Sequence, residues 1–423
     1  MSVTRRDMLK LSGAALFGGA MLLDSRTARA MDAPEIARPM PGSGPYDPGG
    51  LPYTPTITIN GSTLPFRMKD GVKEFHLIAE EFEQEFAPGM KVKVWGYNGS
   101  TPGPTIEAVE GDRVRIFVTN NLPEDTTMHW HGVILPNGMD GVGGLNQEHI
   151  QPGETWVYEF VLRQHGTQMY HPHADEMLQM AVGMMGMFVI HPKGGYRDQI
   201  ARDFTIMLQE WAIHPGTYRP DPSVMVDFNI FTMNGKIFPA IDQLLVKTND
   251  RTRIRFGNLS MDQHPMHIHG HNFKVVGTDG GQIPPSAQWP MTTVPVPVGA
   301  TRDIEFIADN PCDWAFHCHK SHHTMNAMGH TVPNTLGMRH DDVEERIRKI
   351  LPGYMAMEMA EMQDMGGMKG PANTLPMMMG DGPFGNIQMG GMFTIFKVRD
   401  TLDGYDKDPG WYEYPEGTQA RLA

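Results

Sequence analysis

The chain has 423 residues, of which 40% are hydrophobic and 20% charged, so it is long enough to form two or three domains with cores of their own. Its formal net charge is −14 at pH 7, and no block of Lys or Arg stands out. This composition argues against a nucleic-acid partner, because proteins that bind nucleic acids usually carry a basic patch.

The N-terminal segment has the features of an export signal. Twin arginines in TRRDMLK (4–10) precede an apolar run (11–23) and a stretch with small residues, ARA (28–30). The apolar run is too short to span a bilayer comfortably, although a short hydrophobic anchor is the alternative interpretation. We therefore predict a twin-arginine signal peptide over residues 1–30, a periplasmic protein without a membrane span, and an N-terminal extension over residues 31–62.

The segments that follow are typical of an all-β protein. The chain contains 47 glycines and 34 prolines, and short runs of β-like residues recur along it. Examples are RVRIFVTN (113–120), TWVYEFVL (155–162) and RTRIRFGN (251–258). Runs of this length between turn-forming residues predict strands of sheets with one buried face.

Two regions of the chain repeat each other. The segment 96–121 resembles the segment 232–258 in its Asn-Gly, its proline and its alternating strand pattern. Each segment is followed by a His-x-His-Gly motif, and these two motifs lie 138 residues apart; two further His-x-His motifs lie 146 residues apart. We therefore predict two tandem β-domains, over residues 63–197 and 198–400, and a C-terminal tail over residues 401–423.

The second domain is predicted to contain an insertion. Met187 near the end of the first domain corresponds to Met392 in the second, an offset of 205 residues, which is 59 more than the offset of 146. This difference places an insertion at about residues 331–389, which opens with an amphipathic helix pattern. Of the 35 methionines, 11 fall between residues 355 and 392. Capture of the soft ion Cu(I) by thioethers and adaptable packing under a lid are the two interpretations, and we favour the first.

A second methionine cluster follows the second His-x-His motif. Met177, Met180 and Met184 have helical spacing in EMLQMAVGMMGM (176–187). For this cluster the sequence favours packing over metal binding.

Histidine pairs are the most specific feature of the sequence. A single His-x-His often reflects buried histidines with satisfied hydrogen bonds, because side chains two apart on a strand share a face. Four pairs at repeat-equivalent positions are hard to explain as core residues, since every buried imidazole needs polar partners. They predict metal binding by His129, His131, His171, His173, His267, His269, His317 and His319.

A cysteine lies inside the fourth pair. Together with His264, His323 and Met328, Cys318 offers two imidazoles, a thiolate and a thioether, which is the donor set of a blue-copper site. Zinc would prefer a closed tetrahedron without a long bond to methionine. Because Cys318 is covalently joined to both flanking histidines, two metal sites would share one strand end. Cys312 is then predicted to be a free, buried thiol.

These four motifs resemble the copper-binding motifs of the multicopper oxidases, which include laccases and cuprous oxidases, and the resemblance covers about residues 55–330. It implies two cupredoxin-like Greek-key domains, of the sandwich or barrel type, and four copper ions per active unit. Type 1 copper would be bound by His264, Cys318 and His323, with Met328 as the axial ligand. Type 2 copper would be bound by His129 and His267, and the type 3 pair by His131, His171, His173, His269, His317 and His319.

The resemblance also implies an activity. Electrons from Cu(I), from phenolic compounds or from both would enter at type 1 copper, and dioxygen would be reduced to water by four electrons at the trinuclear cluster. Asp140 matches an acid that lies near type 2 copper in many relatives and is predicted to relay protons, with a turn-capping role as the alternative. Thr324 stands where relatives often have a second acid, for which Asp175 or Glu176 could substitute.

The spacing of the motifs bears on assembly. Only 91 residues separate His173 from His264, which leaves no room for a full middle domain. In related two-domain oxidases the trinuclear cluster forms between subunits of a ring-shaped homotrimer, and we expect the same here. Two alternatives remain open: a copper-sequestering protein without turnover, and a copper nitrite reductase, which would need no type 3 pair.

Overall fold

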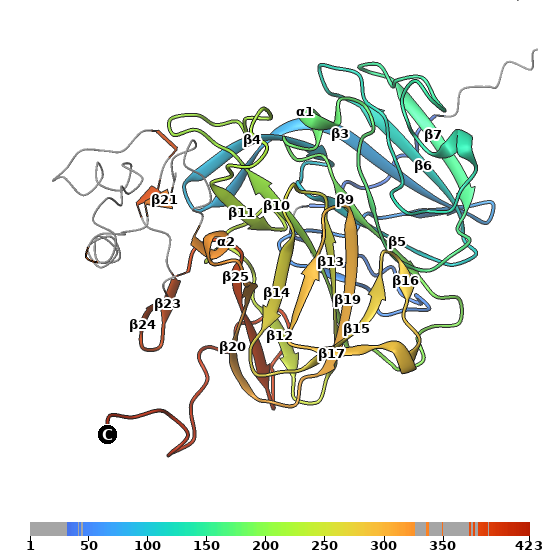
Figure 1. Cartoon of the computed structure of the whole chain (residues 1–423). Helices are drawn as coiled ribbons and strands as arrows, with labels where there is room; N and C mark the ends of the chain where they lie inside the picture. Colours follow the sequence, from blue (N-terminus) through green and yellow to red (C-terminus); the bar gives the residue numbers. More distant parts are fainter. Residues whose placement is uncertain are drawn as a thin grey trace, which may run out of the picture. The chain divides into compact units, whose positions relative to one another are not determined.

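The computed structural model describes residues 32–40, 42–43, 45–325, 336–337, 349, 372–373, 375–376, 380–387 and 389–423. Strands dominate this part of the chain (Figure 1), which confirms the predicted all-β class. Its two labelled α-helices are short, α1 (Glu176–Gln179) and α2 (Ser321–Met325), as are the 3-10 helices η2 (Asn137–Met139) and η3 (Pro285–Ala287). Among the described residues no helix is long and apolar enough to cross a membrane.

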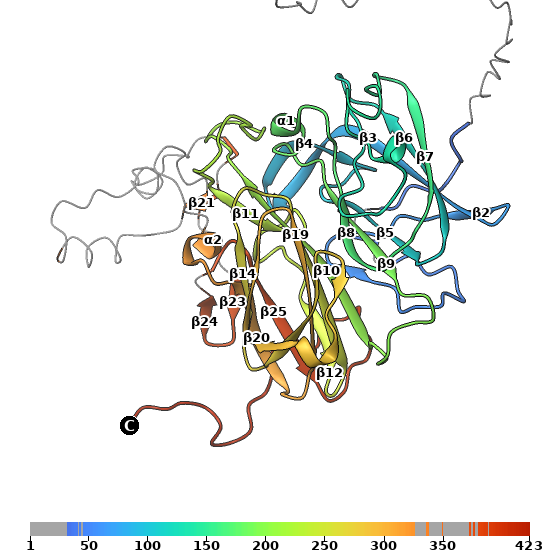
Figure 2. The ribbon, with the colours of Figure 1, turned by 45° about the vertical axis from the view of Figure 1, so that its right-hand side comes forward.

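The first region of the chain forms two sheets that share one core. The larger sheet contains β2 (Arg67–Lys69), β3 (Val72–Ala87), β6 (Arg113–Asn120) and β7 (Thr155–Val161) in that order, with β4 (Met90–Tyr97) paired to β3. The smaller sheet has the order β5 (Gly103–Val109), β9 (Gly186–His191), β8 (Gly166–Tyr170), and these three strands lie side by side in Figure 2. Apolar side chains from both sheets meet in one cluster, as the alternation within β6 leads one to expect.

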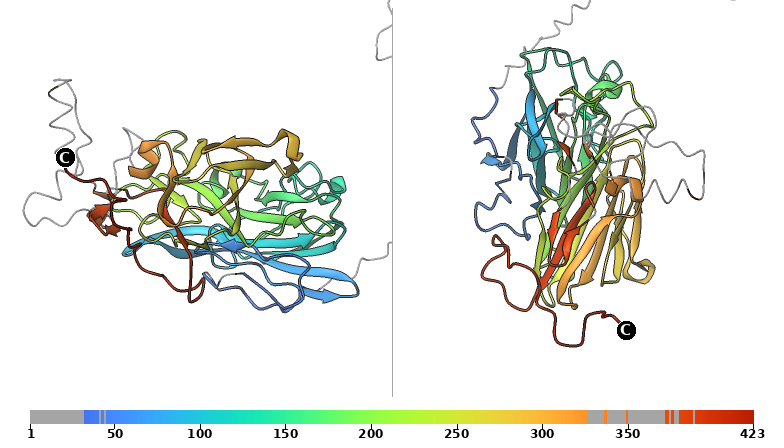
Figure 3. Two further views of the ribbon diagram at one scale, coloured as in Figure 1. Left: turned by 90° about the horizontal axis from the view of Figure 1, so that it is seen from below. Right: turned by 90° about the vertical axis from the view of Figure 1, so that its left-hand side faces the viewer.

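The second region repeats this two-sheet plan with more strands. One sheet contains β1 (Ile57–Thr58), β10 (Arg202–Trp211), β11 (Ile230–Met233), β13 (Arg251–Asn258), β15 (Phe273–Thr278), β16 (Gly281–Gln282), β17 (Trp289–Met291) and β19 (Ala300–Ile307). The other has the order β12 (Leu244–Lys247), β25 (Phe393–Arg399), β20 (Cys312–Cys318), β14 (His264–Ile268), β18 (Thr293–Val296). In the right-hand view of Figure 3 the gold-to-red strands of this region run side by side.

The sequence repeat corresponds to a repeat of strand pairing. In the first region β6 pairs with β7 and β8 with β9, all antiparallel. In the second region their sequence equivalents pair in the same way, β13 with β19 and β20 with β25. The N-terminal extension contributes β1, which pairs in parallel with β10 of the second region.

Several sequence predictions fall on segments for which little or no structure is described. The signal peptide and Met328 lie outside the described residues, and so does most of the predicted insertion. Four short strands of the insertion are described: β21 (Leu336–Gly337), β22 (Leu375–Pro376), β23 (Gly380–Gly382) and β24 (Gly385–Ile387).

The second methionine cluster is only partly packed. Met184 and Met187 are fully or almost fully buried, whereas Met177 is 65% exposed. The sequence prediction of packing therefore holds for the first two residues but not for Met177. The predicted helical face is also wrong, because α1 ends at Gln179.

Candidate metal centres

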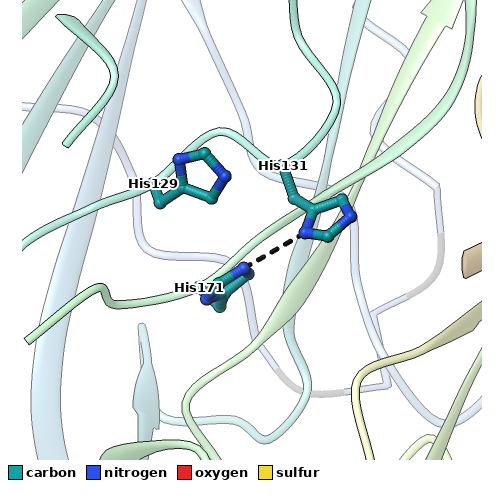
Figure 4. A group of neighbouring side chains, drawn as sticks. All are labelled: His129, His131 and His171. Carbon is teal, nitrogen blue, oxygen red and sulfur yellow. Dashed lines mark hydrogen bonds between the residues drawn. The ribbon is translucent and has the colours of Figure 1, made fainter. Parts of the chain in front are cut away.

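Backbone pairing brings the first two histidine motifs together. The amide of His129 donates to the carbonyl of His171 (2.8 Å), and the amide of His171 donates back to the carbonyl of His129 (3.1 Å). Nδ1 of His131 lies 3.3 Å from Nε2 of His171 (Figure 4). Ring nitrogens of His129, His131 and His171 lie within 4.8 Å of one another. The ring of His173 is 5.6 Å from that of His129, and these four residues are called the first histidine group.

A ladder between β14 and β20 builds the equivalent group in the second region. It places His267 opposite His317. Nε2 of His269 then lies 3.1 Å from Nε2 of His317, and the ring of His319 lies 5.3 Å from that of His267. These four residues are the second histidine group. Among the described residues, no group of neighbouring metal-binding side chains combines histidines from the first region with histidines from the second.

The third constellation is buried. His264 at the start of β14, Cys318 at the end of β20 and His323 on α2 are each fully shielded from solvent. Nδ1 of His323 lies 3.4 Å from the sulfur of Cys318, Nδ1 of His264 lies 4.0 Å from it, and the two Nδ1 atoms are 3.0 Å apart. We call these three residues the cysteine group. They bring together three of the four donors predicted for type 1 copper, and the fourth, Met328, lies outside the described residues.

Hydrogen bonds to the backbone orient four imidazoles of the histidine groups. Nδ1 donates to a backbone carbonyl in His129 (to Asp140, 2.8 Å), His171 (to Pro172, 2.9 Å), His267 (to Thr292, 2.6 Å) and His317 (to Cys318, 2.8 Å). A carbonyl acceptor fixes the tautomer, so the other nitrogen carries a lone pair. This pattern fits copper, for which imidazole is a common ligand.

Protonation of His171 and His317 does not compete with metal binding near neutral pH. Burial lowers the pKa of His171 to about 3 and that of His317 to about 4. Burial also raises the pKa of the Cys318 thiol to about 12. A bound cation is therefore needed to hold the thiolate at neutral pH, since metal ions deprotonate the thiols that coordinate them.

Acidic side chains accompany the first histidine group. A carboxylate oxygen of Asp140 lies 3.5 Å from Nδ1 of His129, and its other oxygen accepts from Asn146 (3.3 Å). The backbone amide of Asp140 closes η2 by donating to the carbonyl of Asn137, which fits the alternative role in a turn, and the proton relay stays a prediction. Of the two candidates for a second acid, Glu176 lies 3.1 Å from Nε2 of His173, whereas Asp175 is the residue before α1. Cys312 is buried and free, as predicted.

Sequence reasoning missed the residues behind the cysteine group. Ser260 Oγ lies 3.0 Å from Nε2 of His264, the ring nitrogen that faces away from Cys318, and Glu210 Oε1 lies 3.5 Å from the same atom. Oδ2 of Asp262 lies 3.6 Å from Nε2 of His323. Burial raises the pKa of Glu210 to about 8. No local motif marks these positions, because Glu210 comes from β10, which reaches the site only through the fold.

Comparison with known proteins agrees with this fold. Models of the multicopper oxidase family match residues 78–195 and 214–336. The solved structure of the multicopper oxidase mgLAC superimposes with a TM-score of 0.59 and 27% identity, covering 80% of this chain and 91% of that one. The blue copper oxidase from Nitrosomonas europaea gives a TM-score of 0.57 and 25% identity, covering 77% of this chain and 85% of that one.

Curated relatives are similar over shorter stretches. The copper resistance protein A homolog of Pseudomonas syringae pv. tomato is 44% identical over 115 residues, which are 27% of this chain and 19% of that protein. Laccase-2 of Botryotinia fuckeliana is 30% identical over 268 residues, 55% of this chain and 44% of that protein. The chain thus spans less than half the length of these curated relatives.

The fold, the repeated histidine groups and the family matches lead to one conclusion. The chain belongs to the multicopper oxidase family.

Proposed function

We propose that the protein is a periplasmic, copper-dependent oxidase that couples one-electron oxidation of Cu(I), phenolic compounds or both to the reduction of dioxygen to water. The observation that carries this proposal is the position of Cys318. Its side chain belongs to the cysteine group, while its two chain neighbours, His317 and His319, belong to the second histidine group. A copper-storing protein would have no need for such a direct covalent connection between two metal sites.

The proposed roles follow the sequence resemblance. His264, Cys318 and His323 would hold type 1 copper with Met328 as the axial ligand. Type 2 copper would be held by His129 and His267, and the type 3 pair by His131, His171, His173, His269, His317 and His319. Copper would supply the one-electron chemistry at the cysteine group and the dioxygen chemistry at the histidine groups.

The surrounding residues have three tasks. Backbone carbonyls orient the imidazoles, as for His171 and His317. Burial of Cys318 excludes water from the thiolate. Asp140, beside His129, would pass protons between solvent and the histidine groups, because its carboxylate is partly exposed and close to a ligand ring.

We further propose that the protein acts as a homotrimer. Each histidine group holds half of the eight imidazoles, and each comes from one region of the chain. A ring in which the first group of one subunit faces the second group of the next would complete the cluster. The proposed domains are residues 63–197 and 198–400. Residues 1–30 would direct export.

Oxygen uptake by the copper-loaded protein tests the oxidase proposal. Cu(I) and a simple phenol are supplied separately, and Cys318→Ser serves as the control that removes the thiolate. We expect steady uptake with at least one donor, and both the uptake and the blue absorption band should be lost in Cys318→Ser. Copper binding without uptake with either donor would instead favour a sequestering protein, and uptake that survives in Cys318→Ser would exclude the proposed electron path.

A further inference from the structure

A cavity in the second region of the chain is separate from the metal centres. Its volume is about 520 Å³, and none of the predicted copper ligands that the structure describes lines it. Residues of β13, β19 and β15, which are neighbours in one sheet (Figure 1), contribute to its lining. The lining contains four basic and two acidic side chains. This excess of positive charge suits an anionic ligand.

One acid of the lining is shared between basic residues of both neighbouring strands. In the sheet register Glu305 on β19 stands opposite Arg253 on β13 and opposite Lys274 on β15. Its carboxylate accepts from Nε of Arg253 (2.9 Å) and lies 3.7 Å from Nη1 of Arg251. The other acid, Asp198, lies 3.9 Å from Nη2 of Arg251. One carboxylate cannot neutralise the three cations around Glu305, so positive charge remains in the cavity.

Arg253 is buried, and one of its donor groups is unused. The side chain is 3% exposed, and its Nε and Nη2 both donate to Glu305. Its Nη1 has no hydrogen-bond partner among the described residues. Asp203 lies 3.8 Å from Nη1, but its carboxylate already accepts two hydrogen bonds of 2.8 Å from Arg255. A buried cationic nitrogen without an acceptor is costly, and an anionic oxygen in the cavity would satisfy it.

Tyr196 holds the guanidinium of Arg253 in place. The hydroxyl of Tyr196 accepts from Nη2 of Arg255 (2.9 Å), which fixes the tyrosine ring. Cζ of Arg253 lies 3.7 Å from the centroid of that ring. Stacking on an aromatic ring restricts the plane of a guanidinium, so Nη1 is positioned before a ligand arrives. Such preorganisation lowers the entropic cost of binding.

Apolar residues make up much of the remaining lining. Phe273 and Phe306, which are 2% and 5% exposed, belong to it together with Val276, Pro285 and Pro290. A bare inorganic anion gains little from such a surface, whereas the body of an organic acid buries apolar area against it. The cavity volume also lies within the roughly 300–1,000 Å³ typical of small-molecule sites.

We propose that this cavity is a binding site for a small organic carboxylate with an apolar body, such as an aromatic acid. A carboxylate oxygen accepts from Nη1 of Arg253, and Arg251 and Lys274 stabilise the negative charge. The apolar body lies against Phe273 and Phe306. The proposal does not depend on the proposed oxidase function, because no predicted copper ligand takes part in it.

Titration calorimetry of the copper-loaded protein with benzoate tests the site, and benzamide serves as a neutral ligand of the same shape. We expect one benzoate to bind per chain at this cavity, and benzamide to bind about tenfold or more weakly. Arg253→Gln removes the unused donor and should weaken benzoate binding about tenfold or more, as expected for loss of one charge-assisted hydrogen bond.

A second variant decides the question if Arg253→Gln does not fold. Lys274→Gln removes an exposed cation of the lining and should weaken benzoate binding about threefold. The matched control is Lys69→Gln, an exposed lysine on β2 that does not line the cavity, and its benzoate affinity should be unchanged. Benzoate bound directly at copper would be equally unaffected in Lys274→Gln and in the control.

Three results would overturn the proposal. The first is an absence of benzoate binding, or equal benzoate affinity in Lys274→Gln, the control and the unaltered protein. The second is equal affinity for benzoate and benzamide, which would show that the cavity does not recognise the charge. The third is tighter binding of inorganic phosphate than of benzoate, which would make this a site for inorganic anions. Each result is independent of whether the protein consumes oxygen with Cu(I) or a phenol.

Discussion

At the scale of single residues, the histidine groups show how a protein prepares nitrogen ligands. His171 and His317 are repeat-equivalent, and each gives its Nδ1 proton to a carbonyl within its own motif. Each therefore points Nε2 at a neighbouring imidazole, His131 in one group and His269 in the other. In the metal-free protein a hydrogen bond joins each of these nitrogen pairs, and a bound metal ion would take the place of the shared proton.

Burial of these imidazoles predicts a pH dependence for the metal-free protein. The pKa of about 3 for His171 and about 4 for His317 lies below the ordinary value of 6.5. Below pH 6.5 the unfolded chain takes up protons at these rings and the folded protein does not. Stability should therefore fall as the pH falls from about 6.5 to about 4, by up to about 1.4 kcal/mol per pH unit for each ring.

Urea unfolding of the metal-free protein across this pH range measures the effect. His171→Gln, which keeps a polar side chain without a titratable ring, should reduce the slope of stability against pH. An unchanged slope in that variant would show that His171 does not contribute to it.

Asp140 provides the second prediction at this scale. In Asp140→Asn the backbone hydrogen bond that closes η2 is unchanged, but the side-chain amide can no longer carry a proton between solvent and the histidine groups. We expect copper content and the blue absorption band to be retained while the turnover number falls about a hundredfold, within the usual range for loss of a general acid or base. Stopped-flow reoxidation of the reduced protein by dioxygen measures the affected step. Full activity in Asp140→Asn would leave Asp140 with its role in the turn alone.

At the scale of elements, the duplicated strand pairing was open to prediction from the sequence. The motifs have fixed offsets because both regions build the same two-sheet plan, in which β6 with β7 corresponds to β13 with β19. Strand β20 could be recognised from the sequence because its ligands, His317 and Cys318, are adjacent. The role of β1 was not predictable, because a strand of two residues in the N-terminal extension carries no periodic signal.

The loop after η2 offers a test at this scale. Gly141 has φ +87°, and a Cβ atom there would lie 1.7 Å from the carbonyl oxygen of Met128, beside His129. Gly141→Ala should therefore destabilise the metal-free protein by more than the roughly 1–3 kcal/mol typical of a left-handed residue alone, and should lower copper content. Gly138→Ala, in the adjoining η2, is the control, because nothing lies within 4 Å of its added Cβ. Equal stability of the two variants in urea would contradict this account of the loop.

At the scale of the whole molecule, the residues of the metal centres could be predicted from the sequence better than their surroundings. The ligand motifs are short and specific, so the donors between His129 and His323 could be grouped from the sequence alone. Glu210 and Ser260 could not, because residues far apart in sequence meet there through the packing of β10 against the loop at residues 259–263. Such contacts are set by tertiary structure and leave no local pattern.

At this scale, assembly of subunits into a ring would complete the copper cluster. Two half-clusters from different subunits should complete each other, which a mixing experiment tests most directly. His171→Ala breaks the first histidine group and His317→Ala breaks the second, so each variant alone should be inactive.

Oxygen uptake by the two variants co-expressed in one cell is the decisive measurement. If the cluster forms between subunits, random assembly pairs two intact groups at about a quarter of all interfaces, and a corresponding part of the activity should return. The purified mixture should then consume oxygen with a phenol or Cu(I). No uptake from mixed oligomers that do contain both variants would contradict a cluster shared between neighbouring subunits.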